Sequence, residues 1–325
     1  MDRNVVWESA GGEKIPFVQV KEIFREKSLC SDAQEQTKDT FSYKWKREKS
    51  YGGGIWKSDY HDWLNHKYFP NENFKAEDIF ISDCKVLEAG CGAGMSAIAL
   101  LGDKLHNLDY LGVDISDSVD IARKKFEEYG YSKRSRFIQC NLNHIPVQEG
   151  KFDVIFSEGV LHHTDSTEQA IYDLAPFLKQ NGYFMFYVYA KKSPIREFSD
   201  DYIRGCFSSK SNDETWEGLE ALTKLGKALG DLNIEIDVPE NIPYLGIQKG
   251  KINLQRLFYW NIFKCYYRPD WSIEEMNHVN FDWYRPANCH RQTPEEVRKW
   301  CENAGLDVSY MNVEEAGITV VSRKK

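Results

Sequence analysis

The chain has 325 residues, 42% of them hydrophobic and 28% charged, and its formal net charge is −8 at pH 7. This acidic balance argues against a protein whose main partner is nucleic acid, because such proteins present basic surfaces to phosphates. No apolar run approaches the ~20 residues that span a bilayer, and the first residues lack a signal-peptide profile. The eight cysteines form no C-x-x-C pair. We therefore expect a cytoplasmic protein with reduced thiols.

Residues 1–83 are polar and rich in turns, and we expect them to form an N-terminal extension or lid. An aromatic cluster occupies residues 41–45, and the run Gly52-Gly53-Gly54 gives this part of the chain a place to bend. The extension precedes a segment, beginning near residue 84, in which strand and helix patterns alternate.

Residues 85–95 read Lys-Val-Leu-Glu-Ala-Gly-Cys-Gly-Ala-Gly-Met, an apolar strand followed by a glycine-rich turn and an apolar helix. This strand–turn–helix unit is typical of proteins that hold a nucleotide at a helix N-terminus. Met95 stands where the dinucleotide fingerprint requires Gly or Ala, which argues against a pyrophosphate ligand. We expect the carboxylate of Glu88 at the mouth of the site, where it would repel phosphate and attract a ligand carrying ammonium and sulfonium charges.

Three further strand patterns follow the glycine turn, at residues 110–116, 136–142 and 152–158. The first ends in Asp114, about twenty residues after the turn, where an acid in a nucleotide-binding unit holds the ribose hydroxyls. The second ends in the polar pair Cys140-Asn141, which we expect to meet an adenine edge. The third leads into a loop with the adjacent histidines His162 and His163.

These residues resemble the class I S-adenosylmethionine-dependent methyltransferases, over roughly residues 84–190 and again over 293–323. The resemblance implies S-adenosyl-L-methionine as the cofactor and S-adenosyl-L-homocysteine as its product. Many members carry Asp in the adenine loop where this chain has Cys140-Asn141, but the Asn141 amide oxygen can still accept a hydrogen bond from the adenine amine. The cofactor-binding residues implied in this way are Glu88, Gly90, Cys91, Gly92, Gly94, Asp114, Ile115, Asn141, Leu142, Ser157 and Glu158.

We expect an α/β fold with a doubly wound, seven-stranded and mostly parallel sheet. Its core would comprise residues 84–190 and 291–325, with a fifth strand at 182–189, a capped helix beginning at Thr293, and a closing antiparallel hairpin at 306–313 and 318–322. The intervening residues 191–290 would form a substrate-side insert.

The insert contains two apolar segments. A helix over 214–229 would place Trp216, Leu219, Leu222, Leu225 and Leu229 near one face. A second helical segment over 254–267 is aromatic on more than one face. Its interpretations are a lid core or a subunit contact that makes a homo-oligomer, or a membrane-surface helix or acyl-chain pocket.

Methyl transfer requires an aligned acceptor, and a hydroxyl acceptor also requires a general base. His162 and His163 are the candidate catalytic residues, because the loop after the fourth strand faces the methyl group in this fold. Packing or helix capping is the alternative for this pair, and a metal site of His162, His163 and Asp165 is disfavoured because adjacent histidines point in different directions. Glu158 contacts either the methionine amine or the acceptor, or is a buried structural acid.

Two outer segments resemble parts of stand-alone small-molecule and sugar methyltransferases of bacterial glycan and natural-product clusters. The resemblance makes Tyr43 and Trp45 candidates for covering the cofactor, and Tyr284, Arg285 and His290 candidates for the acceptor side. Arg285 would hold an anionic group through its bidentate fork. Core packing of the aromatic residues and a surface salt bridge of Arg285 are the alternatives.

The sequence thus predicts a methyltransferase of a small molecule, with a hydroxyl or amine of a sugar or nucleotide-sugar-like compound as the acceptor. A natural-product or lipid-like acceptor, a protein acceptor, and a non-catalytic cofactor-binding module remain as alternatives. A nicotinamide oxidoreductase is disfavoured by the glycine spacing and by Glu88. A base-modifying enzyme is disfavoured because Ser157-Glu158-Gly159-Val160 is neither an Asn/Asp-Pro-Pro-aromatic loop nor a Pro-Cys nucleophile.

Overall fold

The computed structural model describes residues 3–8, 12–28, 30–51, 54–70 and 75–325. The chain divides into two compact units. The first consists of the described residues within Met1–Lys46, Gly54–Ala190 and His290–Lys325, and the second of those within Arg47–Gly53 and Lys191–Cys289. Two glycines of the predicted hinge, Gly52 and Gly53, lie outside the described residues.

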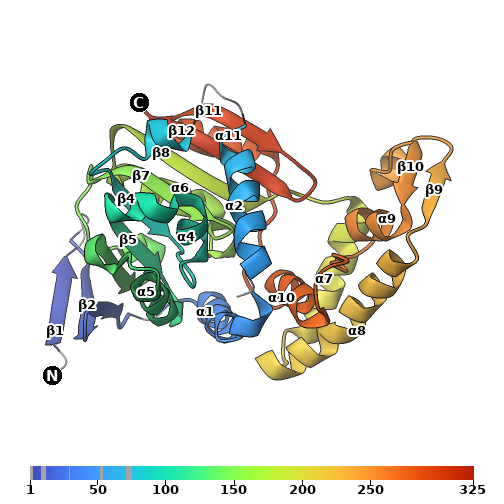
Figure 1. Cartoon of the computed structure of the whole chain (residues 1–325), viewed down its shortest axis with the longest axis horizontal. Helices are drawn as coiled ribbons and strands as arrows, with labels where there is room; N and C mark the ends of the chain where they lie inside the picture. The colour runs from blue at the N-terminus through green and yellow to red at the C-terminus, as the bar shows by residue number, and fades with distance from the viewer. Residues whose placement is uncertain (1–2, 9–11, 29, 52–53, 71–74) are drawn as a thin grey trace. The chain divides into compact units, whose positions relative to one another are not determined.

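The first unit is built on one large sheet, in which the described residues supply ten strands (Figure 1). The strand order is β1-β2-β3-β6-β5-β4-β7-β8-β12-β11. All pairs from β3 to β8 are parallel, and the pairs at both edges are antiparallel. The strands are β1 Arg3–Glu8, β2 Lys14–Val20, β3 Ile23–Glu26, β4 Lys85–Ala89, β5 Asp109–Asp114, β6 Ser135–Gln139, β7 Phe152–Glu158, β8 Leu178–Tyr189, β11 Leu306–Val313 and β12 Gly317–Lys324.

The doubly wound α/β fold and the closing hairpin of β11 and β12 are as predicted from the sequence. The sheet is larger than the predicted seven strands because β1, β2 and β3 extend it beyond β6. In β2, Ile15 and Phe17 are buried while Lys14 and Pro16 are exposed, which is the alternation of a strand with one covered face. This short pattern lies within a polar segment, and we expected an extension there instead of strands.

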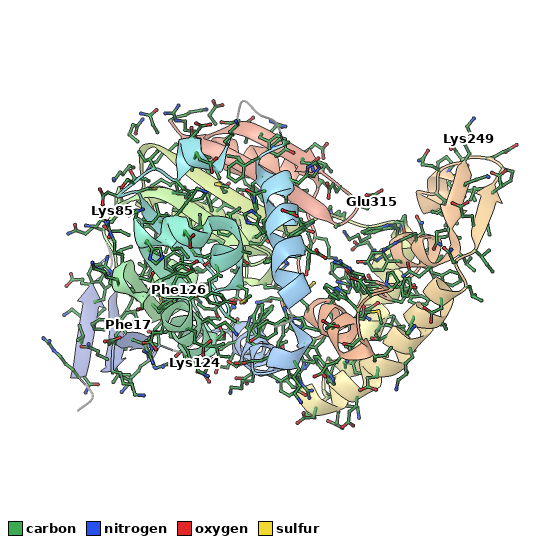
Figure 2. All side chains as sticks on the ribbon, in the orientation of Figure 1. Phe17, Lys85, Lys124, Phe126, Lys249 and Glu315 are labelled. Atoms are coloured by element: carbon green, nitrogen blue, oxygen red, sulfur yellow. The ribbon has the colours of Figure 1, made fainter. Side chains whose placement is uncertain are left out.

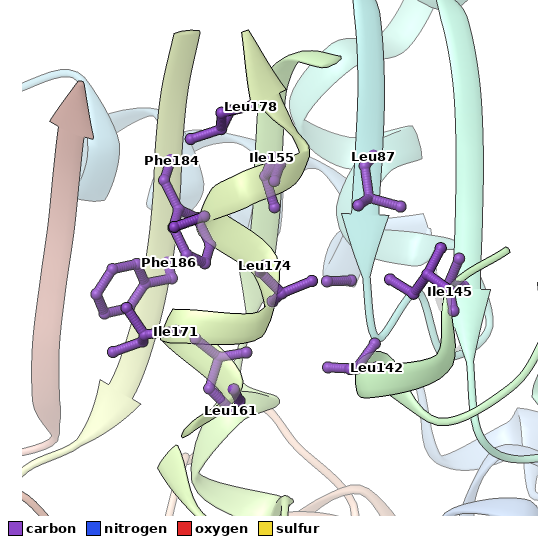
Figure 3. Close-up of a cluster of buried hydrophobic side chains, with 14 of the residues drawn as sticks. Leu87, Leu142, Ile145, Ile155, Leu161, Ile171, Leu174, Leu178, Phe184 and Phe186 are labelled. Atoms are coloured by element: carbon purple, nitrogen blue, oxygen red, sulfur yellow. The ribbon is translucent and has the colours of Figure 1, made fainter. Parts of the chain in front are cut away.

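Helices cover both faces of the sheet, because adjacent residues of each central strand belong to different cores. Leu87 joins the cluster that includes Ile171 and Leu174 of helix α6, Thr167–Leu174 (Figure 3). Val86 joins the cluster that includes Phe126 of helix α5, Ser118–Glu128; Phe126 is labelled in Figure 2. Successive apolar residues that face opposite sides of a strand are typical of a parallel sheet that is buried on both faces.

The helices and helical turns of this unit are α1 Asp32–Trp45, α2 Gly54–Tyr68, α3 Ala76–Ile79, α4 Met95–Leu101, η2 Gly102–His106, α5 Ser118–Glu128, η3 Ser132–Arg134, η4 Leu142–His144, η5 Leu161–His163, α6 Thr167–Leu174, η6 Ala175–Phe177 and α11 Pro294–Asn303. The predicted capping box at the start of α11 is present, since Thr293 accepts from the N–H of Glu296 and the Glu296 carboxylate accepts from the N–H of Thr293.

The chain first adds strands to the sheet on one side of β4 and then on the other side. From β4 it builds outward through β5 and β6, and it then returns to place β7 on the other side of β4. Open α/β sheets bind ligands at the carboxyl ends of the strands beside such a switch point. This position gathers the ends of β4, β5, β6 and β7.

The second unit is mainly helical and includes a two-stranded antiparallel ribbon of β9 and β10. Its elements are η1 Glu48–Ser50, α7 Pro194–Phe207, α8 Asn212–Asp231, β9 Glu235–Val238, η7 Pro243–Leu245, β10 Gly250–Asn253, α9 Leu254–Asn261 and α10 Ile273–Tyr284. None of the helices in the part of the chain that the structure describes is long and apolar enough to cross a membrane.

Both predicted helices of the insert differ in detail from the expectation. The buried face of α8 includes Trp216, Leu219 and Thr223, whereas Leu225 is exposed. Helix α9 ends at Asn261, well before residue 267. The backbone N–H groups of Lys264 and Tyr266 donate to side chains of other helices. They therefore cannot continue the hydrogen-bond ladder of α9.

Candidate functional site

The turn between β4 and α4 is held open by three glycines with positive φ. Gly90, Gly92 and Gly94 have φ values of 84°, 50° and 78°, a region that residues with a Cβ rarely adopt. The N–H groups of Gly90 and Cys91 donate to the carbonyl of Val113 at 2.7 and 2.9 Å. The turn is thus fixed to the neighbouring strand β5 immediately before α4.

Asp114, the last residue of β5, is bonded directly to this turn. Its Oδ2 accepts a hydrogen bond from the N–H of Gly92 at 2.9 Å, and its Oδ1 accepts from the N–H and hydroxyl of Ser116. The Ser118 hydroxyl also bonds this carboxylate, so most of its about four acceptor positions are used. Burial raises the pKa of Asp114, and these hydrogen bonds oppose the rise.

The loop after β6 carries Asn141 and Leu142 next to an acid that the sequence analysis did not identify. The N–H of Asn141 donates to Oε2 of Glu26, the last residue of β3, at 2.8 Å, while Leu142 is buried in the core. The other carboxylate oxygen of Glu26 is bonded to His144, and this bond raises the pKa of the His144 imidazole. Only the pairing of β3 with β6 brings Glu26 here, so no local sequence signal could have indicated it.

Glu88 does not lie at the mouth of the site, as we had expected. Its side chain is 1% exposed, and the hydroxyl of Tyr110 donates to its carboxylate. Two residues apart on β4, Val86 and Glu88 point to the same face of the sheet, and Val86 packs with Tyr110 in the core of that face. Burial in this core raises the pKa of Glu88 to about 8.

At the end of β7, Ser157 and Glu158 are both engaged by neighbouring groups. The Ser157 hydroxyl donates to the carbonyl of Ala89 at 2.8 Å, which ties the ends of β7 and β4 together. Glu158 pairs with Lys67 and accepts from the hydroxyl of Tyr68, both at the end of α2. Burial lowers the pKa of Lys67 to about 8, although Glu158 opposes this shift. The sequence analysis missed Lys67 and Tyr68, since helix α2 carries no recognisable motif.

Helix α1 lies along the loops that end β4, β5 and β7. At its C-terminal end, the indole of Trp45 contacts Gly92, since a Cβ added there would stand 2.9 Å from the ring. In its middle, the Ser42 hydroxyl accepts from the N–H of Asp117, and Phe41 packs edge-on against His163 with centroids 5.0 Å apart. At its start, the Ser31 hydroxyl donates to the Asp165 carboxylate. Tyr43 belongs to the same helix and is partly buried.

The two candidate catalytic histidines are buried in the loop after β7. His162 is 0% exposed, and its ring lies on Tyr189 with centroids 3.7 Å apart, while the centroid of His163 is 4.3 Å from that of His162. His290 is brought to the same loop, where its N–H donates to the carbonyl of His162 and its ring bonds the carbonyl of Thr164. The histidines are therefore clustered beneath α1, with their rings against aromatic side chains.

Tyr284 and Arg285, expected on the acceptor side, are engaged within the second unit. The buried hydroxyl of Tyr284 donates to Asp200 and to the carbonyl of Lys264 at 2.6 and 2.9 Å. The guanidinium of Arg285 donates to the Asn212 side chain and the carbonyl of Lys210. The fork of Arg285 thus stabilises the start of α8 and does not present two free donors to an anion.

Residues 87–186 match the family model described as a methyltransferase domain. This segment is therefore similar to a methyltransferase domain. The chain is 30% identical over 113 residues to the uncharacterized methyltransferase YcgJ of Bacillus subtilis, covering 34% of this chain and 43% of the relative. It is 36% identical over 103 residues to the tRNA U34 carboxymethyltransferase of Hydrogenovibrio crunogenus, covering 30% of each chain. The chain spans less than half the length of the curated relatives it matches.

A solved structure of a methyltransferase from Aquifex aeolicus, described as dependent on S-adenosylmethionine, superimposes with a TM-score of 0.41 at 14% identity. It covers 83% of this chain and 98% of that one.

The residues of the matched segment fit S-adenosylmethionine. The positive φ values of the three glycines keep side chains away from the turn, and the Asp114 carboxylate is bonded to it through the N–H of Gly92. The turn has no room for a side chain at Gly92, where Trp45 already lies against the backbone. A cofactor at this place would therefore lie between the turn and α1, the helix of Tyr43 and Trp45, for which the resemblance implied this covering role.

Proposed function

We propose that this protein is an S-adenosylmethionine-dependent methyltransferase that acts on a hydroxyl or amine of a small molecule, with a sugar or nucleotide-sugar-like acceptor as the favoured class. The observation that carries the proposal is the bond from the Gly92 N–H to the Asp114 carboxylate, inside a segment matched as a methyltransferase domain. It joins a glycine turn and a ribose-binding acid, the two groups that a nucleoside cofactor requires at a switch point.

In this proposal, the carboxyl ends of the strands bind the cofactor. Gly90, Gly92 and Gly94 allow close approach of the backbone, and Asp114 holds the ribose through a charge-assisted hydrogen bond. Asn141 and Leu142 border the adenine, and Ser157 keeps the ends of β4 and β7 together. When bound, S-adenosylmethionine supplies a methyl group on a positively charged sulfur.

The remaining groups of the site align the acceptor and exclude water. Trp45 and the rest of α1 cover the glycine turn, which removes water from a reaction centre that would otherwise be solvated. For a hydroxyl acceptor, His162 or His163 takes the proton as the new bond forms, since histidine exchanges protons near neutral pH. An amine acceptor needs only its neutral lone pair and no base from the protein.

The acidic chain supports a small-molecule acceptor. With a net charge of −8, a polyanion would be repelled at long range. The tRNA-modifying relative is similar over 30% of this chain only. The second unit, where the acceptor would be selected, is outside the matched segment.

The proposal is tested by incubating the protein with a metabolite extract and S-adenosylmethionine labelled in its methyl group. Mass spectrometry should reveal labelled small molecules that require the protein and disappear with Asp114→Asn. The same labelling is carried out with bulk tRNA and with a protein extract. Label found only in tRNA or protein would overturn the small-molecule acceptor, and label in none of the three would overturn the enzyme itself.

A further inference from the structure

The second unit contains a buried carboxylate that is saturated with hydrogen bonds. Asp200 of α7 is 1% exposed, and its Oδ2 accepts from Nε of Arg196 at 3.1 Å and from the indole N–H of Trp283 at 2.8 Å. Its Oδ1 accepts from the hydroxyl of Tyr284 and from the N–H of Lys264. A carboxylate has about four acceptor positions. Asp200 therefore has none to spare for another donor.

Arg196 is left with donors that this carboxylate cannot satisfy. The side chain is 1% exposed, and its Nη1 is buried without a hydrogen-bond acceptor among the described residues. The guanidinium carbon lies over the rings of Tyr259, Trp260 and Trp283, at 4.8, 5.5 and 5.3 Å from their centroids. A charged donor that is buried without an acceptor is unfavourable, because it loses its hydration and gains no hydrogen bond in return.

Two lysines converge on the same indole. Nζ of Lys264 lies 4.9 Å and Nζ of Lys192 lies 5.6 Å from the centroid of Trp283. Lys264 is 5% exposed, whereas Lys192 is partly exposed. Helices α7, α9 and α10, which carry or flank these residues, lie together in Figure 1.

The cations repel each other despite nearby acids. Burial, followed by repulsion from Arg196 and Lys264, lowers the pKa of Lys192 to about 6, and Glu197 and Asp200 oppose this shift. Burial also lowers the pKa of Lys264 to about 8, an effect that Asp282 opposes. Glu197 and Asp282 are partly exposed, whereas Arg196, Asp200 and Lys264 are buried.

We propose that Arg196, Lys192 and Lys264 form a binding site for the phosphoryl group of a small molecule. A phosphate monoester carries up to two negative charges and three acceptor oxygens, which match the buried guanidinium and the two amines. The burial of the site favours a terminal phosphoryl group on a small molecule over the backbone of a nucleic acid. That this molecule is the methyl acceptor rests on the proposed function, whereas the phosphoryl site itself does not.

Pulse labelling of the full chain with acetic anhydride tests the site, because only a neutral amine reacts. At pH 7.5, Lys192 should react faster than exposed Lys124 of α5. Inorganic phosphate should slow Lys192 in a saturable way, since each unit of rise in pKa above the labelling pH lowers the neutral fraction about tenfold. Lys124 is the internal control, and sodium chloride at equal ionic strength is the control for screening.

Three results would overturn the phosphoryl site. These are an unchanged rate at Lys192, an equal slowing by chloride, and slowing by tRNA or by phosphatidic acid vesicles but not by inorganic phosphate. Arg196→Lys removes Nη1 while keeping the charge beside Asp200, and it should abolish the protection. Arg268→Lys, at the exposed ion pair with Asp270, is its matched control. If Arg196→Lys fails to fold, the wild-type labelling still decides the question.

Calorimetry with S-adenosylmethionine on the same preparation separates the two proposals. Protection of Lys192 without cofactor binding would overturn the proposed function and leave the phosphoryl site intact. Cofactor binding without protection of Lys192 would overturn the phosphoryl site and leave the proposed function intact.

Discussion

The indole of Trp45 lies against the backbone of Gly92, so closely that a Cβ on Gly92 would stand 2.9 Å from the ring. The two residues are 47 positions apart, one at the end of α1 and the other in the turn before α4. This contact places an aromatic ring against the glycine turn, which we propose binds the cofactor. A ligand on this turn is therefore enclosed by the N-terminal part of the chain as well as by the domain.

Replacement of Gly92 by valine should abolish cofactor binding while the far-UV circular dichroism stays close to that of the wild type. The side chain would collide with Trp45 and fill the space that a ligand needs. Gly150→Val is the matched control, because Gly150 also has a positive φ, of 62°, but has nothing within 4 Å of an added Cβ. Normal calorimetric binding by Gly92→Val would mean that the turn does not hold the cofactor.

Asp114→Asn should weaken S-adenosylmethionine binding by about 10- to 150-fold, the equivalent of the ~1.5–3 kcal/mol that a hydrogen bond to a charged group contributes. The amide keeps the size of the side chain but loses the charge and one acceptor. Asp120→Asn, on the exposed face of α5 beside Arg25, is the control. Equal affinities of the two variants would remove Asp114 from the site.

Glu88 should make the stability of the protein depend on pH. Burial raises its pKa from an ordinary value of 4.5 to about 8, with Asp114 and Glu158 adding to the rise and the hydrogen bond from Tyr110 opposing it. Between these values the folded protein holds a proton that the unfolded chain has released. The free energy of unfolding should therefore fall as pH rises through that window.

Denaturant unfolding of the cofactor-free protein at pH 5 and pH 8.5 measures this effect. Between pH 5 and pH 8.5, the free energy of unfolding should fall less in Glu88→Gln than in the wild type. Glu77→Gln is the control, because the hydrogen bond from Lys104 lowers the pKa of the exposed Glu77, so that it titrates below the window. Parallel changes in the wild type and Glu88→Gln would show that Glu88 is already charged at pH 5.

If the acceptor is a hydroxyl, replacing the catalytic histidine by glutamine should lower kcat by about 10²–10⁴, with little change in KM. His162→Gln and His163→Gln are compared with His66→Gln, which changes an exposed histidine of α2. Unchanged kcat in both variants would leave the pair with a packing role beside Tyr189 and point to an amine acceptor.

The sequence predicted the elements whose structure is determined by residues close together in the chain. The sequence indicated strand β4, its glycine turn and the position of Asp114, because these residues are adjacent or separated by one helix. It also indicated the capping box of α11, which depends only on Thr293 and Glu296. These elements obey rules of spacing and backbone conformation that one segment satisfies by itself.

What the sequence did not predict arises from contacts between distant segments. Glu26 reaches Asn141 because β3 joins β6, and Lys67 reaches Glu158 because α2 packs beside the end of β7. Glu88 was misplaced because its direction depends on which face of β4 meets Tyr110. Each of these contacts is decided by packing, which no short motif encodes.

The most direct test of the account is a calorimetric titration of the wild-type protein with S-adenosylmethionine, with NADH titrated separately. We predict saturable binding of S-adenosylmethionine with one site per chain, and no binding of NADH. Saturable binding of NADH, or the absence of S-adenosylmethionine binding by a folded protein, would contradict the assignment of the glycine turn and Asp114 to this cofactor.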